Sequence, residues 1–304
     1  MTTLGVALAG GRSQRFGKDK LAALLDGTPL LAHVLRHLKE VTATVAVSVE
    51  SEEHAERLRP ILPSGTRIIL DPPGRSETGP LGGILATLAV ERTSDLLFVA
   101  GDMPWLEGKV LAALEATTRA AGFDAACPWG RDGRVEPLVL WVRKGAGRRL
   151  VESPAAAAFP RRRSTDLIRS VSHPGIVPTE QLGGTPLTFA NVNTREDLER
   201  SRKIASMPMG PSATGEPRQT CSVPPDAPRA FWEAREAVAR GRPEEALDSL
   251  GREAEVYRDF GIPLLEYHCL TDAYGVMPEG HREDPERRAR RARLKAGFPD
   301  GGRG

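Results

Sequence analysis

The sequence has few cysteines, few aromatic residues and almost no net charge. Its three cysteines, Cys127, Cys221 and Cys269, are far apart and form no CxxC pair, which argues against a disulfide framework or a zinc site. The 42 Lys and Arg residues nearly balance the 40 Asp and Glu residues, so extensive contact with nucleic acid is not expected. No apolar run approaches the roughly 20 residues that span a bilayer, and the N-terminus lacks the pattern of a signal peptide. We therefore expect a cytoplasmic protein with neither nucleic acid nor membrane as a partner.

Short apolar runs alternate with longer amphipathic stretches in the first half of the chain. The runs typical of buried strands lie at residues 4–8, 45–49, 67–70, 95–100, 125–128 and 138–142. Stretches with the spacing of one helical face lie at residues 29–39, 81–90 and 107–121. This alternation indicates βαβ units. It predicts an α/β fold with a Rossmann-like, mainly parallel sheet and helices on both faces.

The composition changes after about residue 205. Residues 206–228 are rich in Pro, Ser, Thr and Gly and predict a linker. Residues 229–304 predict a small helical region of unknown role, in which Gly241-Arg242-Pro243 separates two helices. An apolar helical face there is expected to form core, and it consists of Trp232, Val238, Leu247, Leu250, Val256 and Leu264. The expected organisation is thus a domain over residues 1–205, followed by the linker and the helical region.

The strongest chemical signal is LAGGRSQRFGKDK at residues 8–20, directly after the first predicted strand. The adjacent glycines Gly10 and Gly11 let backbone N–H groups approach a phosphate closely. The loop also carries four cations, which are Arg12, Arg15, Lys18 and Lys20. Several donors at once suit a triphosphate. The spacing fits neither a Walker A loop nor the dinucleotide GxGxxG pattern. No histidine is expected near the loop.

Two aspartates directly follow predicted strands. Asp102 comes after the run 95–100, and Asp71 comes after the run 67–70. Both should therefore lie at the carboxyl edge of the sheet, where open α/β sheets bind ligands. Asp102, with Gly101 giving room beside it, is the expected Mg²⁺ ligand. The alternative is that these aspartates only cap a turn or a helix.

Four later segments follow the glycine-rich loop in a fixed order. They are LDPPGRSETGPLGGI at 70–84, FVAGDMPWL at 98–106, EPLVLWV at 136–142 and FANVNTREDL at 189–198. Together with the loop they resemble the molybdenum cofactor guanylyltransferase family, over roughly residues 1–205. The resemblance implies a Mg²⁺-dependent transfer of GMP from GTP to the terminal phosphate of molybdopterin or Mo-molybdopterin, with release of pyrophosphate. It also implies partner proteins in cofactor biosynthesis or among the molybdoenzymes.

The resemblance assigns roles to particular residues of this chain. Those implied to be catalytic are Arg15, Lys20 and Asp102. Those implied to bind the nucleotide are Leu8, Ala9, Gly10, Gly11, Lys20, Ser48, Asp71, Gly79 and Asp102. Asn191 and Asn193 are implied to face the acceptor, although they could instead only end an edge strand. An acceptor phosphate is already an anionic nucleophile, so positioning and charge neutralisation would suffice without a general base.

The sequence departs from the family at two of these segments. Ser48 stands where the family often has Asn, and Glu136 stands where the family more often has His. The AGG triplet and the Asp19-Lys20 pair nevertheless favour guanylyl over cytidylyl transfer. A cytidylyltransferase for the same pterin and a sugar-phosphate nucleotidyltransferase stay open as alternatives. A non-catalytic nucleotide-binding partner protein is a further alternative, which the combination of Lys20, Asp71 and Asp102 disfavours.

Overall fold

A computed structural model describes residues 2–10, 19–71, 79–92, 94–130, 133–159, 162–184, 187–194, 196–197, 199 and 219–277. Its strands are β1 (Thr3–Leu8), β2 (Leu24–Leu25), β3 (Thr28–Pro29), β4 (Thr44–Val49), β5 (Arg67–Leu70), β6 (Asp95–Ala100), β7 (Ala125–Trp129), β8 (Val139–Val142), β9 (Pro174–Pro178) and β10 (Cys221–Ser222). Its helices are α1 (Leu30–Val41), α2 (Glu52–Leu58), α3 (Pro80–Val90), α4 (Gly108–Ala120), α5 (Arg148–Glu152), α6 (Thr165–Ser170), α7 (Thr179–Leu182), α9 (Asp226–Ala239), α10 (Pro243–Asp259) and α11 (Pro263–Val276). Short 3₁₀ turns add η1 (Lys20–Ala22), η2 (Arg59–Ile61) and η4 (Pro154–Ala157).

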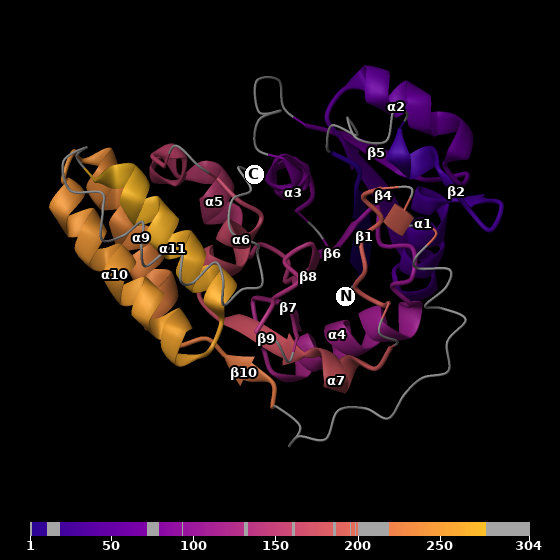
Figure 1. The fold of residues 1–304 in the computed structure, drawn as a ribbon. Coiled ribbons are helices and arrows are strands. Elements are labelled where there is room, and N and C mark those ends of the chain that lie inside the picture. The colour runs from indigo at the N-terminus through magenta and orange to yellow at the C-terminus, as the bar shows by residue number, and fades with distance from the viewer. Residues whose placement is uncertain are drawn as a thin grey trace.

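An eight-stranded sheet forms the centre of the described chain, in the order β10-β9-β7-β8-β6-β1-β4-β5 (Figure 1). β1 pairs in parallel with both β4 and β6, and the pairs β4–β5 and β7–β9 are parallel too. β8 runs antiparallel between β6 and β7, and the short β10 runs antiparallel to β9 at the edge. The predicted mainly parallel sheet is therefore confirmed.

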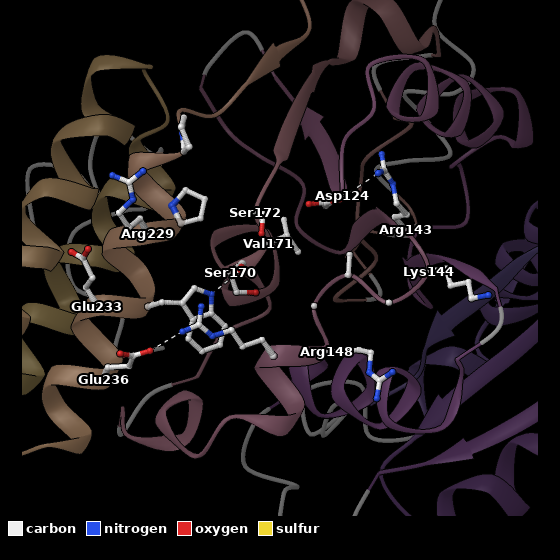
Figure 2. A pocket seen from close by; sticks show the side chains of 17 residues that line it. Asp124, Arg143, Lys144, Arg148, Ser170, Val171, Ser172, Arg229, Glu233 and Glu236 are labelled. Carbon is white, nitrogen blue, oxygen red and sulfur yellow. Dashed lines mark hydrogen bonds and ion pairs between the residues drawn. The ribbon is translucent and has the colours of Figure 1, made fainter.

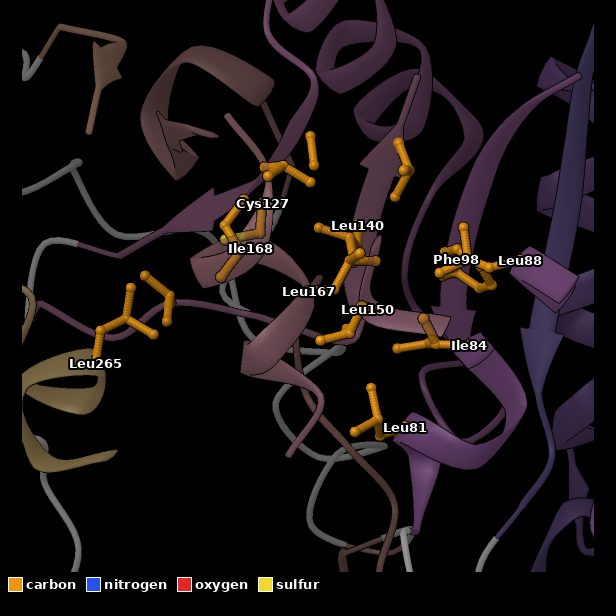
Figure 3. Close-up of a cluster of buried hydrophobic side chains, with 14 of the residues drawn as sticks. Leu81, Ile84, Leu88, Phe98, Cys127, Leu140, Leu150, Leu167, Ile168 and Leu265 are labelled. Carbon is orange, nitrogen blue, oxygen red and sulfur yellow. The ribbon is translucent and has the colours of Figure 1, made fainter. Parts of the chain in front are cut away.

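Helices cover both faces of this sheet. α1, α2 and α4 pack on one face through a hydrophobic cluster that includes Leu111. α3, α5 and α6 pack on the other face through a cluster that includes Ile84 and Leu167 (Figure 3). β1 contributes to both clusters, with Ala7 in the first and Leu8 in the second, because alternate side chains of a strand point to opposite faces. The two-sided arrangement that the apolar runs predicted is confirmed.

The C-terminal helices α9, α10 and α11 pack against the domain that precedes them (Figure 1). The cluster that holds Ile84 and Leu167 continues into them through Phe231, Tyr257 and Leu265. The apolar face predicted from Trp232 to Leu264 is confirmed as core, since Trp232, Leu250 and Leu264 are buried and the remaining members pack against the clusters. Of the predicted linker, residues 219–228 carry β10 and the start of α9, whereas 206–218 lie outside the described residues.

A buried ion network joins α6 to the C-terminal helices. Arg169 donates through Nε and Nη2 to the two oxygens of Glu253, at 2.8 and 2.9 Å, and through Nη1 to Asp272 at 3.0 Å. Asp166 lies between Arg169 and Arg235, at 3.2 and 3.3 Å from them. All five side chains are at most 1% exposed. Removing one member would leave its partners charged and unpaired away from water, so this network fixes how the helices dock.

The described part of the chain holds no helix that is long and apolar enough to cross a membrane.

Candidate active site

The carboxyl ends of β1 and β6 lie side by side, because these two strands pair in parallel along their whole length. The chain runs outward from β1 through β4 to β5 and then returns to the opposite side of β1 as β6. At this switch point the turns are tied together: Ala9 N–H donates to Ser48 O at 2.9 Å, and Gly101 N–H donates to Leu8 O at 3.0 Å. A crevice at a switch point is where open α/β sheets bind their ligands.

Lys20 and Asp102 meet in this crevice. Lys20 Nζ lies 2.6 Å from Asp102 Oδ2, and it also donates to Asn193 Oδ1 at 3.2 Å. The Lys20 and Asp102 side chains are 21% and 15% exposed, so both are reachable from solvent. The N–H of Val192 donates to Asp102 O at 3.0 Å and holds the segment of Asn193 against the end of β6. Three predicted site residues, far apart in the sequence, are thus in direct contact.

Asp19 fixes the position of Lys20. Its Oδ1 accepts from Leu21 N–H at 3.1 Å and caps η1, which begins at Lys20. Its Oδ2 lies 2.8 Å from Nε2 of His54, a buried residue of α2. Burial raises the pKa of Asp19, but the hydrogen bonds from His54 and Leu21 N–H, with the charges of His54 and Arg57, outweigh it and hold the pKa below its usual value. The expectation that no histidine lies near the loop is therefore wrong, since α2 brings His54 there from 35 residues away.

Ser48 and Asp71 form a second polar pair beside Gly10. Ser48 is 1% exposed, and its hydroxyl donates to Asp71 Oδ1 at 3.1 Å. Burial raises the pKa of Asp71, although the hydrogen bond from Ser48 opposes the shift. A Cβ added at Gly83 of α3 would come 2.5 Å from Ser48 Oγ, so the helix packs directly on this serine. Ser48 acts here by orienting Asp71, and its own hydroxyl faces the interior.

A cavity of about 220 Å³ joins these groups. Its walls come from the ends of β1 and β6, from η1 and from the start of α3, and they consist of Leu8, Ala9, Gly10, Lys20, Leu21, Pro80, Ala100, Asp102 and Leu138. Gly79 caps α3 with φ of 55°, a conformation that side chains disfavour. Because Pro80 lines the cavity, the positive end of the α3 dipole lies at its wall, which favours an anion.

The predicted site residues are thus largely gathered at one edge of the sheet. Asn191 is exposed, and its side chain makes no hydrogen bond to other described residues. Gly11 and Arg15 lie outside the described residues. Glu136 lies in the segment before β8, where its N–H donates to Pro128 O. Sequence reasoning missed His54, which lies three residues after Ser51, the residue that caps α2.

A divalent metal would have one carboxylate of this chain at the site. Among the residues with described positions, no three His, Cys, Asp or Glu side chains come together to hold a metal ion. Mg²⁺ commonly binds to one or two carboxylates together with substrate phosphates and waters, and Asp102 alone suits that mode. The donor set present therefore fits a metal that arrives with a nucleotide.

Open α/β sheets hold nucleotides at such a switch point. A cation beside a carboxylate suits the transfer of a phosphorus-centred group. The fold and the site together are those of a nucleotidyltransferase. Residues 5–198 match the model of the MobA-like NTP transferase domain, and the chain belongs to this family. A probable molybdenum cofactor guanylyltransferase of Thermococcus gammatolerans is 32% identical over 204 residues, which cover 66% of this chain and 99% of the relative. One of Thermococcus kodakarensis is 33% identical over 199 residues, with 65% and 92% covered.

The fold is similar to a solved structure as well. The molybdopterin-guanine dinucleotide biosynthesis protein A of Archaeoglobus fulgidus is 26% identical and superposes with a TM-score of 0.54, covering 67% of this chain and 98% of its own. The family match ends at residue 198, so α9, α10 and α11 lie outside it.

Proposed function

We propose that the chain is a molybdenum cofactor guanylyltransferase, which moves GMP from GTP to the terminal phosphate of molybdopterin or Mo-molybdopterin and releases pyrophosphate. The contact of Lys20 with Asp102 in the cavity at the sheet edge carries this proposal. The names of the relatives that match nearly their whole length support the choice of nucleotide and acceptor. A cytoplasmic location, expected from the sequence, stays a prediction.

Lys20 supplies the positive charge that the reaction needs. An oxygen of the acceptor phosphate forms a bond to the α-phosphorus of GTP, while the bond from that phosphorus to the bridging oxygen breaks and pyrophosphate leaves with the electron pair. Negative charge grows on the leaving group, and an ammonium held by Asp102 and Asn193 can move onto it. The acceptor is already ionised at neutral pH, so no residue has to remove a proton.

Asp102 would hold Mg²⁺ together with the phosphates of the nucleotide. The metal would supply electrostatic stabilisation of charge on those phosphates. In this arrangement Lys20 would turn from Asp102 to the phosphates of the nucleotide, which would leave the Asp102 carboxylate for the metal. The pair thus orients both side chains before the nucleotide arrives.

Asp71 is the group that would read the base. Guanine presents adjacent N–H donors on its Watson–Crick edge, and an ionised carboxylate accepts two hydrogen bonds from such a pair. Ser48 fixes one oxygen of Asp71 and leaves Oδ2, which lies toward Gly10. Asn193, beside Lys20, would contact the acceptor phosphate through its amide, and Asn191 is assigned the same task two residues earlier.

Calorimetric titration with GTP, CTP and ATP, each with and without Mg²⁺, tests the nucleotide first. We expect tightest binding of GTP with Mg²⁺; a preference for CTP would move the assignment to a cytidylyltransferase. Turnover with molybdopterin then tests the chemistry in Asp102→Ala, which should lose activity while keeping its melting temperature. Asp248→Ala, which removes an exposed aspartate of α10, is the matched control. Wild-type turnover in Asp102→Ala would refute the role of this carboxylate.

A further inference from the structure

A second cavity, of about 650 Å³, is shown in Figure 2. It lies at the opposite edge of the sheet from Lys20 and Asp102. Lys144 lines it, and the N–H of Lys144 donates to Asp95 Oδ1 at 2.6 Å. Asp95 begins β6, whereas Asp102 follows the end of β6. The strand therefore separates the two cavities by roughly 20 Å, at about 3.3 Å per residue. The volume is in the range of pockets that bind small molecules.

Two parts of the chain form the walls of this cavity. One wall is the segment 143–149, which runs from the end of β8 into the first turn of α5. Residues 170–172 at the end of α6 belong to the same wall. The other wall is α9, which contributes Arg229, Trp232, Glu233 and Glu236. Because α9 lies outside the residues that match the family, the cavity exists only where the helical region docks. The nucleotidyl transfer proposed above makes no use of it.

The charges on the lining are unequal and divided between the walls. Five cations line the cavity, namely Arg143, Lys144, Arg148, Arg149 and Arg229. Three carboxylates line it, namely Asp124, Glu233 and Glu236. Four of the five cations belong to the segment 143–149, whereas two of the three carboxylates belong to α9 (Figure 2). One side of the cavity is thus basic, and the facing side mixes carboxylates with one arginine.

The cations can turn toward a ligand at little cost. Arg148 pairs with Glu152, which is not part of the lining, and both side chains are exposed, at 41% and 56%. Lys144 has no carboxylate within ion-pair distance among the residues whose positions are described. Exposed ion pairs stabilise a protein only weakly, so a ligand with a higher charge density can displace them. Arg148 and Lys144 are therefore available to an anion.

The walls themselves are held in place without a ligand. The guanidinium of Arg149 lies 4.0 Å from the ring centre of Trp232 and pairs with Glu236 at 2.7 Å. The indole N–H of Trp232 donates to Ser170 O at 2.8 Å, deep in the cavity. Gly147 adopts φ of 76°, and a Cβ there would collide with Leu167, so the basic segment folds tightly onto α6. A ligand would find these walls formed in advance and only Arg148 and Lys144 would have to turn toward it, which lowers the entropy cost of binding.

We propose that this cavity binds a small phosphate ester that carries hydroxyl groups, of the size of a sugar phosphate. The basic segment takes the phosphate, because guanidinium forks and an ammonium match its oxygens. Glu233 on the facing wall pairs with Arg252 through Oε2 at 2.7 Å, and its Oε1 accepts hydrogen bonds from the hydroxyl groups. Since α9 contributes two carboxylates and one cation to the lining, this wall suits hydroxyl groups better than a second anionic end.

The test is calorimetric titration of the full chain at about 0.15 M salt with ribose 5-phosphate, inorganic phosphate and ribose. We expect ribose 5-phosphate to bind tightest, inorganic phosphate to bind more weakly and ribose not to bind. Lys20→Ala removes a phosphate donor of the first site and should leave this binding unchanged. The double variant Lys144→Ala/Arg148→Ala should weaken it about a hundredfold, at about tenfold for each charged hydrogen bond.

Arg242→Ala is the matched control for Arg148, since Arg242 pairs with Glu245 and both are similarly exposed, at 44% and 57%. It should bind ribose 5-phosphate as the wild type does. Glu233→Gln should weaken ribose 5-phosphate more than inorganic phosphate. Absence of binding at millimolar concentration, or binding that survives in the double variant, would overturn the proposal. Equal affinity for ribose 5-phosphate and inorganic phosphate would overturn the assignment of an ester, and loss of binding in Lys20→Ala would place the ligand at the first site.

Discussion

Nε2 of His54 lies 2.8 Å from Oδ2 of Asp19, and this contact ties α2 to the residue that precedes Lys20. The other oxygen of Asp19 caps the turn that begins at Lys20. His54 is 3% exposed, so it cannot exchange this partner for water without local unfolding. The position of the Lys20 ammonium therefore depends on a histidine that does not itself reach the cavity.

Replacing His54 should slow the reaction more than it weakens substrate binding. His54→Ala removes the hydrogen bond that orients Asp19, and we expect kcat to fall about tenfold with a smaller change in KM for GTP. His54→Gln keeps a donor and should restore part of the rate. His37→Ala, on the outer side of α1 where His37 pairs with Glu40, is the control. A rise in KM alone would show that His54 serves binding and leaves the position of Lys20 unaffected.

Asp19 should also make the stability of the protein depend on pH in the acid range. Its pKa in the folded state is below the usual 3.8, so ionised Asp19 favours the folded state above that pH. This contribution is lost as the pH falls through the folded-state pKa. The free energy of unfolding of Asp19→Asn should therefore lie below that of the wild type at pH 7 and approach it at an acid pH well below 3.8. Urea titrations at the two pH values measure the difference, and an unchanged gap would contradict the prediction.

Ser48 should influence the choice of nucleotide through Asp71. Ser48→Ala removes the donor that fixes Asp71 Oδ1, and we expect the ratio of kcat/KM for GTP to that for CTP to fall about tenfold. Ser64→Ala, at an exposed serine before β5, should leave the ratio unchanged. If Ser48→Ala keeps the full preference for GTP, the base is read elsewhere.

The three cysteines should differ sharply in reactivity. All three are free thiols. Burial raises the pKa of Cys127 to about 12, with the charge of Glu136 adding to the shift, and burial also raises the pKa of Cys269 well above its usual value. Cys221, in the edge strand β10, is only partly buried. At pH 8 a thiol reagent such as dithionitrobenzoate should modify Cys221 quickly and the others only on unfolding. Cys221→Ser should abolish the fast phase, and rapid modification of a second thiol would refute the assignment.

A substitution in the buried ion network should destabilise the protein far more than a substitution of a nearby surface charge. Glu253→Gln leaves Arg169 without its bidentate partner, and we expect a loss of about 3–5 kcal/mol in the free energy of unfolding. Glu255→Gln, two residues later on the exposed side of α10, should change it by about 0.5 kcal/mol or less. Denaturant titration compares the two variants. Equal effects would mean that the network contributes little.

Local pattern accounts for most of the fold and for part of the site. The apolar runs that end at Leu8 and Ala100 predict buried strands. The position of Asp102 at the carboxyl edge of the sheet could be predicted as well, because Asp102 comes just after the end of one of these strands. The contact between Lys20 and Asn193 joins residues 173 apart, and the resemblance to a family gave both residues a role at the site without indicating this contact. The pairing of Arg169 with Glu253 had no signal in the sequence, since both read as surface charges until α6 and α10 pack together. Contacts of this kind depend on tertiary packing, which periodicity does not encode.

The hydrophobic cluster that extends from Ile84 to Leu265 has a consequence for how this chain can be divided. The match to the family ends at residue 198. The packing of side chains shows no domain boundary at that point, because one hydrophobic cluster extends across it. A chain cut after residue 205 would lose β10 from the sheet edge and would leave Asp166 and Arg169 facing water without their partners. We therefore expect the transferase unit to be unstable without the C-terminal helices, although these helices lie beyond the residues that match the family.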